Sequence, residues 1–312
     1  LKRMTSTVTI TKHMGRLGNN MIYLIQAIDY CLSKNYQRLI FKKPIASNNH
    51  SINFLLKGDA IDIDTPQTSA SPPSEEHWGH YFYREKVSFT RRREIAQKYI
   101  LPKILVTANQ TISPNSLVIH LRGGDIFCRG HYAYVQPPIS FYEKIIESRK
   151  WEKVYLISED TRNPCYNAIV EKYQASKTSK AQIVTFSNKS PDRHGGNGWG
   201  FKDDFELMLG ATHFLASKSS LSPLIIQLST KMKHVYLADY FLDSSEQRDK
   251  EARFEKAENQ IWWSNEFKNK TEDFKSCGID FHVSNYKAYI SKFNASNYDL
   301  SQHSSRQLML EN

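Results

Sequence analysis

The stretch VIHLRGGDIF, residues 118–127, has the composition of a buried strand that stops at two glycines and an aspartate. Alternate residues of a strand share one face, so Val118, His120 and Arg122 point one way and the residues between them point the other way. Open α/β sheets bind ligands at the carboxyl ends of their strands. This strand therefore predicts a site that contains His120 and Arg122.

The turn after this strand carries groups suited to an anion. Gly123 and Gly124 allow a sharp turn and a close approach of a ligand to the backbone. Arg122 offers a fork of donors that matches a diphosphate, and Asp125 can hold that guanidinium or accept a proton. The alternative is structural, with His120 bonded to backbone groups and an Arg122–Asp125 ion pair that closes the turn. The stretch alone leaves both interpretations open.

Strands and helices alternate on both sides of this stretch. Residues 7–13 and 38–43 read as strands, and the apolar residues of 21–32 have helical spacing, with Asn19 or Asn20 as the expected cap. The later strands are expected at 117–121, 153–158, 181–186, 212–217 and 234–238, and the helices between them at 139–149, 164–173, 203–210 and 222–229.

This alternation predicts an α/β protein with two Rossmann-like domains. The first is expected at residues 1–114 and the second at 115–245, with a helical segment, 246–312, that packs across them. Residues 44–73 are polar and rich in serine, asparagine and proline, which indicates an irregular excursion. The basic run RRREIAQK at 91–98 is predicted as the solvated face of a helix.

Two further turns join a strand to a helix. GRLGNN at 15–20 has G-x-x-G spacing, which fits neither a dinucleotide fingerprint nor a Walker loop. Asp203 and Asp204 are expected to open one helix, and Ser219 and Ser220 to precede the next. Hydroxyls and free N–H groups at a helix start suit a phosphate. The alternatives are an ordinary tight turn and two helix caps.

Two segments have more than one interpretation. Residues 192–200 contain four glycines and are expected to form either a mobile lid or a connector. The segment at 75–86 is rich in aromatic residues. Trp78, Tyr81 and Tyr83 either stack on sugar rings or belong to the core.

The overall composition limits the class of protein. The chain has 312 residues, a formal net charge of +10 and four scattered cysteines. We expect no transmembrane segment, no disulfide framework and no structural zinc site. The basic charge favours anionic partners, but no nucleic-acid-binding motif is present, so we expect no nucleic-acid partner. The cysteine usage favours the cytoplasm; the Golgi lumen is the alternative for an excised catalytic domain.

Four blocks of the chain resemble, in the same order, the motifs of the α-1,2-fucosyltransferases. GRLGNNM resembles their G-x-L-G-N-Q-M, GHYFYREKVSF their G-Y-F-Q-S-E-K-Y-F, and VIHLRGGDIF their V-H-I-R-R-G-D-Y. DDFELMLGATHFLASKSSLSPL is similar to D-L-x-L-M-S-x-C-K-H-x-I-x-A-N-S-S-F-S-W-W. The H-x-R-x-G-D block is the most specific. Asn20, Gly123, Ser217-Lys218 and Pro223-Leu224 depart from the family pattern and indicate a divergent member.

The resemblance implies a GT-B glycosyltransferase, with two Rossmann-like domains that face each other across a cleft. It implies metal-independent, inverting transfer of L-fucose from GDP-fucose to an oligosaccharide or glycoprotein acceptor, with an α-linkage of the α-1,2 type and no cofactor. Arg122 grips the β-phosphate, and His120 lies near the ribose and diphosphate. Of the other donor-side positions, Asp203 or Asp204 approaches the nucleoside, Ser219 and Ser220 bind phosphate oxygens, and Gly15, Arg16 and Asn19 border the reaction centre.

The expected catalytic residues are Arg122, Asp125 and His120. Asp125 is the candidate base for the acceptor hydroxyl, with His131 and Glu159 in reserve. Two alternatives remain: the same fold with another nucleotide sugar, or a basic nucleotide- or glycan-binding protein without catalysis. The chain is also compatible with one piece of a larger multi-domain glycosyltransferase.

Overall fold

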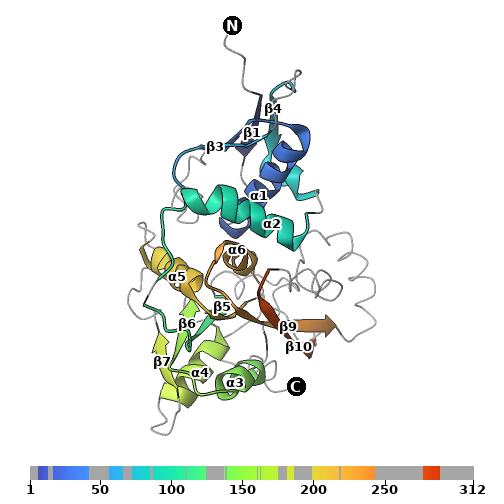
Figure 1. The fold of residues 1–312 in the computed structure, drawn as a ribbon. Coiled ribbons are helices and arrows are strands. Elements are labelled where there is room, and N and C mark those ends of the chain that lie inside the picture. Colours follow the sequence, from blue (N-terminus) through green and yellow to red (C-terminus); the bar gives the residue numbers. More distant parts are fainter. Residues whose placement is uncertain are drawn as a thin grey trace. The chain divides into compact units, whose positions relative to one another are not determined.

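A computed structural model gives the fold, a mixed α/β architecture with two sheets (Figure 1). The residues described are 6–12, 17–41, 56–65, 72–84, 87–109, 111–123, 137, 139–159, 161, 163–174, 181–185, 199–217, 219–242 and 277–288. The chain divides into two compact units. The first unit is Leu1–Thr107, His194–Lys202 and Ser220–Ser229; the second is Ala108–Arg193, Asp203–Ser219 and Thr230–Asn312.

The first unit contains a sheet with the strand order β3-β2-β1-β4. Its strands are β1 (Thr7–Lys12), β2 (Arg38–Phe41), β3 (Ala60–Asp62) and β4 (Glu75–Trp78). β1 is parallel to β2 and β4, whereas β3 is antiparallel to β2. Helix α1 (Leu17–Lys34) connects β1 to β2, which confirms the predicted strand–helix–strand unit.

Helix α1 begins earlier than the sequence pattern predicts. Its first residue is Leu17, so Asn19 and Asn20 lie inside the first turn, and the prediction that one of them caps the helix is wrong. The reason is that Leu17 and Met21 are both buried, which extends the apolar face of the helix by one turn. Asn20 is itself buried.

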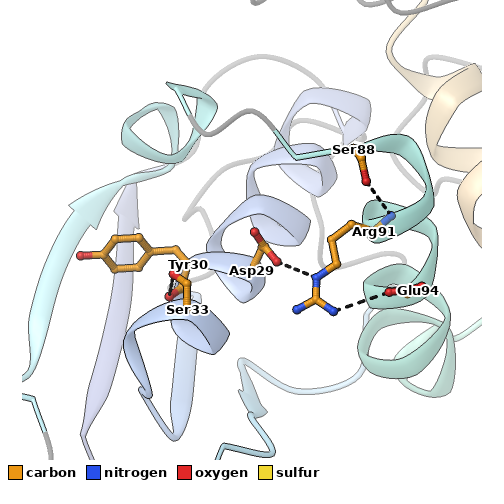
Figure 2. A network of polar contacts seen from close by, with 6 residues as sticks. All are labelled: Asp29, Tyr30, Ser33, Ser88, Arg91 and Glu94. Atoms are coloured by element: carbon orange, nitrogen blue, oxygen red, sulfur yellow. Dashed lines mark hydrogen bonds and ion pairs between the residues drawn. The ribbon is translucent and has the colours of Figure 1, made fainter. Parts of the chain in front are cut away.

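The basic run at 91–98 is a solvated helix face only in part, because Arg91, Glu94 and Lys98 are exposed whereas Arg92 is buried. Its first residues lie in α2 (Phe89–Ile95), which is capped by Ser88, whose Oγ accepts a hydrogen bond from the Arg91 N–H at 3.2 Å. Arg91 pairs with Asp29 of α1 at 2.8 Å (Figure 2). Arg92 is only 3% exposed, and Arg93 donates to the carbonyl of Ile226. Tertiary packing therefore gives each arginine a separate role.

Helix α6 (Leu221–Leu228) belongs to the first unit, although it lies within the range 115–245. It packs on α1 and α2, and every residue from Ser222 to its end is buried. Five of the six residues from 223 to 228 are Leu, Ile or Pro, so the helix needs cover on more than one side. Gly18 of α1 lies directly against Ser220 and Leu221, which leaves no room for a side chain at position 18.

The second unit contains a parallel sheet with the strand order β10-β9-β8-β5-β6-β7. Its strands are β5 (Leu117–Leu121), β6 (Lys153–Ser158), β7 (Gln182–Thr185), β8 (His213–Leu215), β9 (His234–Leu242) and β10 (Asp280–Ala288). Numbered along the chain, these strands have the order 3-2-1-4-5-6 of doubly wound dinucleotide-binding folds. The sequence-based expectation of a Rossmann-like sheet is met here.

Helices α3 (Ile139–Glu147) and α4 (Pro164–Gln174) cover one face of this sheet, and α5 (Trp199–Gly210) precedes β8. Leu117, Ile119 and Leu121 form one core cluster with residues of α3 and α4. Fully burying side chains of this size contributes about 1.5–3 kcal/mol each. The predicted alternation of β5 is confirmed, because these three residues share the face opposite His120.

Residues 280–288 form a strand, which corrects the expectation of a helical segment over 246–312. β10 pairs in parallel with β9 over its whole length. Phe281 and Val283 alternate there with His282 and Ser284, a period of two that is typical of strands. The rest of the 246–312 range lies outside the described residues. Among the helices that the structure describes, none is long and apolar enough to cross a membrane.

Three histidines lie near the amino ends of β8, β9 and β10. The rings of His213 and His234 stack at 4.4 Å, and Nε2 of His282 lies 3.3 Å from Nδ1 of His234. Tyr236 Oη is 3.2 Å from His213 Nδ1, and Arg149 Nη1 is 3.5 Å from His213 Nε2. Burial, followed by the neighbouring His234 and Arg149, lowers the pKa of His213 from 6.5 to about 4.

Replacing Gly18 with alanine is expected to destabilise the protein. The new Cβ would lie 2.5 Å from Ser220 Oγ and 2.8 Å from the Leu221 nitrogen. Overpacking costs about 1–3 kcal/mol, more than the roughly 1 kcal/mol by which alanine favours a helix. The urea midpoint should fall for Gly18→Ala and stay unchanged for Lys34→Ala, an exposed position of the same helix. A midpoint that rises for Gly18→Ala would contradict the packing.

Stability is expected to fall on acidification from about pH 6.5 to about pH 4. The unfolded chain protonates His213 near 6.5, whereas the folded chain resists until about 4, so acid favours unfolding. His213→Asn should reduce the drop in melting temperature between about pH 7 and about pH 5, measured by differential scanning fluorimetry. His120 and His234 also have lowered pKa values, so part of the drop should persist. An unchanged drop would show that His213 is not coupled to folding.

Candidate functional site

The carboxyl ends of β5 and β8 lie side by side in the second sheet. β5 pairs with β6 on one side and with β8 on the other. The strands that follow β5 extend the sheet one way, and those that follow β8 extend it the other way. This is the topological switch point, where ligands of open α/β sheets bind.

His120 and two serines meet at this point. His120 is the fourth residue of β5, and its Nδ1 lies 2.9 Å from Oγ of Ser217. Ser217 donates in turn to Oγ of Ser219 at 3.2 Å. The tautomer of the His120 ring decides whether Nδ1 donates to Ser217 or accepts from it.

His120 is held in its neutral form. The ring is only 8% exposed. Burial, followed by the positive charge of Arg122, lowers its pKa from 6.5 to about 3. The imidazole therefore offers hydrogen bonds without charge, and Arg122 is the cation of this cluster.

Asn163 ties the end of β5 to the start of α4. Its Nδ2 donates to the Arg122 carbonyl at 2.9 Å, and its Oδ1 accepts from the Cys165 N–H at 2.9 Å. Asn163 is fully buried. Sequence reasoning missed this residue, although an asparagine directly before Pro164 is a recognisable helix start, with Asn as cap and Pro at the first helical position.

Ser219 and Ser220 are half-buried and lie between β8 and α6. Ser220 precedes the first residue of α6, but its side chain makes no capping hydrogen bond. Asn19 is half-buried in the first turn of α1. Glu159 directly follows β6 and is half-buried.

Asp203 and Asp204 do not open a helix, because α5 begins four residues before them at Trp199. Asp203 is exposed, whereas Asp204 is 7% exposed, so the two carboxylates face different surroundings. Their sequence-predicted place at a helix start is therefore wrong. The first turn of α5 is formed by the residues that precede Asp203, beginning with Trp199 and Gly200.

Several predicted residues lie outside the described residues: Gly15, Arg16, Asp125, His131 and the loop at 192–198. Among the described residues, no group of three or more histidine, cysteine, aspartate or glutamate side chains is arranged to hold a metal ion.

The aromatic segment of the first unit divides into core and surface. Phe82 is fully buried, but Trp78 is 58% exposed and Tyr81 is 43% exposed. Of the two interpretations, the core one is therefore wrong for Trp78 and Tyr81. The side chain of Tyr83 is not among those described.

No family model and no curated protein matches the chain. Among solved structures, the chain is similar to the bacterial iron-containing dodecameric glycosyltransferase TibC from enterotoxigenic E. coli H10407. The sequence identity is 17% and the TM-score is 0.38, over 77% of this chain and 59% of that one. The chain thus spans less than two thirds of TibC.

Replacing Asn163 with alanine is expected to remove the hydrogen bonds to the Arg122 carbonyl and the Cys165 N–H and to lower the free energy of unfolding by about 1–3 kcal/mol. Asn167 is a matched control, because its side chain also donates to a backbone carbonyl but is exposed on the same helix. Urea unfolding followed by circular dichroism should show a clear loss for Asn163→Ala and little change for Asn167→Ala. Equal effects would remove the case for Asn163 as a positioning residue.

Proposed function

We propose that the protein is an inverting, metal-independent glycosyltransferase that moves L-fucose from GDP-fucose to a hydroxyl of a glycan. The proposal rests on the group of side chains at the ends of β5 and β8. These are the Arg122 cation, the neutral His120, and the hydroxyls of Ser217 and Ser219. The resemblance of four sequence blocks to the α-1,2-fucosyltransferases supports the choice of donor.

Arg122 stabilises the leaving group in this mechanism. Breaking the bond between the anomeric carbon and the phosphate oxygen leaves positive charge on the sugar and negative charge on GDP. A guanidinium binds two phosphate oxygens at once, and the hydroxyls of Ser219 and Ser220 add further donors. Losing one such donor typically reduces the rate about 10²–10³-fold.

His120 acts as an uncharged hydrogen-bonding group rather than as a base. A ring with a pKa of about 3 is too weak a base to take a proton from a sugar hydroxyl. The resemblance places this ring near the ribose and the diphosphate of the donor. We assign the base to Asp125, with His131 and Glu159 as alternatives.

The acceptor oxygen attacks the anomeric carbon on the face opposite the diphosphate. The new carbon–oxygen bond forms as the bond to phosphate breaks, and the hydroxyl proton passes to the base. A β-linked donor then gives an α-linked product, of the α-1,2 type by resemblance. In the proposed GT-B arrangement the second unit holds the donor and the first unit holds the acceptor, an oligosaccharide or glycoprotein. The cytoplasm is the proposed compartment.

A second candidate keeps the fold and the mechanism but uses another nucleotide sugar. The net charge of +10 also fits a binding protein without catalysis that takes an anionic ligand. Donor hydrolysis separates these candidates from the leading one.

The test is release of nucleotide from GDP-fucose, GDP-mannose, UDP-glucose, UDP-galactose and UDP-xylose, each with EDTA and without acceptor. We expect GDP from GDP-fucose, and a loss of about 10²–10³-fold in rate for Arg122→Ala. Arg149→Ala is the control, because Arg149 bonds His213 at the opposite, amino end of the same sheet. This variant should retain the activity.

Release of nucleotide from another donor would replace fucose as the transferred sugar and leave the proposed mechanism unchanged. If no nucleotide is released from any donor but GDP binds by calorimetry and Arg122→Ala abolishes that binding, the protein is either a transferase with a strict acceptor requirement or a binding protein, and an acceptor screen separates the two. Absence of both release and GDP binding would overturn the proposal.

A further inference from the structure

A histidine and two serines form a continuous line of polar atoms beyond the end of β8. Nδ1 of His120 lies 2.9 Å from Oγ of Ser217, and Oγ of Ser217 lies 3.2 Å from Oγ of Ser219. A backbone turn holds the two serines together, because the Ser219 N–H donates to the Ser217 carbonyl at 2.9 Å. The three side chains therefore form one connected group, the His120–Ser217–Ser219 chain.

Ser217 is the enclosed middle member of this chain. It is only 2% exposed and His120 is 8% exposed, whereas Ser219 is half-buried. Hydrogen bonds in such a low-dielectric interior are electrostatically stronger than in water, and successive bonds polarise one another. The chain thus runs from two buried groups to a more accessible hydroxyl.

The hydroxyl at position 217 belongs to this sequence and not to the motif that it resembles. The quoted α-1,2-fucosyltransferase motif has alanine where Ser217 stands, and alanine cannot bond to an imidazole. Ser219, by contrast, matches a serine of that motif. The connection between His120 and Ser219 is therefore an addition made by Ser217.

The direction of the two bonds depends on a single proton. The His120 ring is neutral, because burial and then the charge of Arg122 lower its pKa from 6.5 to about 3. A neutral imidazole has one N–H, and a hydroxyl has one proton to give. When Ser217 gives its proton to Ser219, the bond between His120 and Ser217 requires an N–H at Nδ1. Ser219 is then the acceptor and does not spend its own proton on this bond.

We propose that Ser217 is a positioning residue that directs the hydroxyl of Ser219 at a diphosphate. In this arrangement Nδ1–H of His120 donates to Ser217, Ser217 donates to Ser219, and Ser219 donates to a phosphate oxygen. Because each bond polarises the next, Ser219 becomes a stronger donor than a serine outside such a chain. The choice of a diphosphate rests on the proposed function, whereas the direction of the bonds does not.

Nitrogen-15 NMR of the histidine side chains in the full protein tests the direction of the bonds. The chain has 11 histidines, and His120→Gln identifies the His120 signals by their loss. We expect one tautomer in the wild type, with the proton on Nδ1, and a mixture of both tautomers in Ser217→Ala. A proton on Nε2 in the wild type, or an unchanged His120 spectrum in Ser217→Ala, would overturn the proposal.

Calorimetry with inorganic pyrophosphate, GDP and guanosine tests the effect on the ligand. Ser217→Ala should raise the dissociation constants of pyrophosphate and GDP about threefold to tenfold, the effect of weakening one hydrogen bond. Guanosine has no phosphate, so its dissociation constant should stay unchanged. Ser217→Thr, which keeps the hydroxyl, should bind all three as the wild type does.

Ser116→Ala is the matched control, because Ser116 is a fully buried serine directly before β5 whose hydroxyl has no hydrogen-bond partner among the described residues. It should leave all three dissociation constants unchanged. Equal binding of pyrophosphate and GDP by wild type and Ser217→Ala, or an equal loss of guanosine binding, would overturn the proposal.

The same samples separate this proposal from the proposed transferase. Pyrophosphate binding that depends on Ser217, without binding or hydrolysis of GDP-fucose, would refute the transferase and support the role of Ser217. Binding and hydrolysis of GDP-fucose that Ser217→Ala leaves unchanged would support the transferase and overturn the role of Ser217. Absence of both pyrophosphate and GDP binding by the wild type would overturn both.

Discussion

The hydrogen bond between His120 and Ser217 joins the carboxyl ends of β5 and β8, where the order of the second sheet reverses. A buried imidazole is tolerated only with a partner, because an unpaired polar group in the interior is costly. The bond to Ser217 provides that partner, and burial beside Arg122 keeps the ring neutral. Among the described residues at this point, the arrangement brings together the Arg122 cation, a neutral imidazole and serine hydroxyls, and the proposed chemistry depends on them.

The position of α6 adds a second constraint, which acts on Ser219 and Ser220. The chain passes from the second unit to the first between Ser219 and Ser220. It does so because α6, which is buried from Ser222 to its end, packs against α1 and α2. Ser219 is therefore followed directly by a residue packed in the first unit, where Gly18 allows close contact with Ser220.

His120 and His77 have the same side chain in opposite surroundings. His120 is enclosed, and its surroundings remove its charge, so it acts only through hydrogen bonds. His77 is partly exposed, donates a hydrogen bond to Glu75, and stacks on the ring of Tyr81. The difference arises from the neighbours: a serine and an arginine surround the first ring, and a carboxylate and a tyrosine surround the second.

The sequence by itself determined β1, β2, the strands β5 to β9 and most of the helices, and the placement of His120 and Arg122 at a strand end, because periods of two and 3.6 record which face of each element is buried. It did not predict β3, which lies in the stretch 44–73 expected to be irregular, nor β4 and β10. It also did not predict the early starts of α1 and α5, the separate roles of Arg91 to Arg93, or the link through Asn163. Only the tertiary structure decided those, along with the membership of α6 in the first unit. The physical reason is that a local pattern specifies which face is buried, whereas the partner of that face comes from a distant part of the chain.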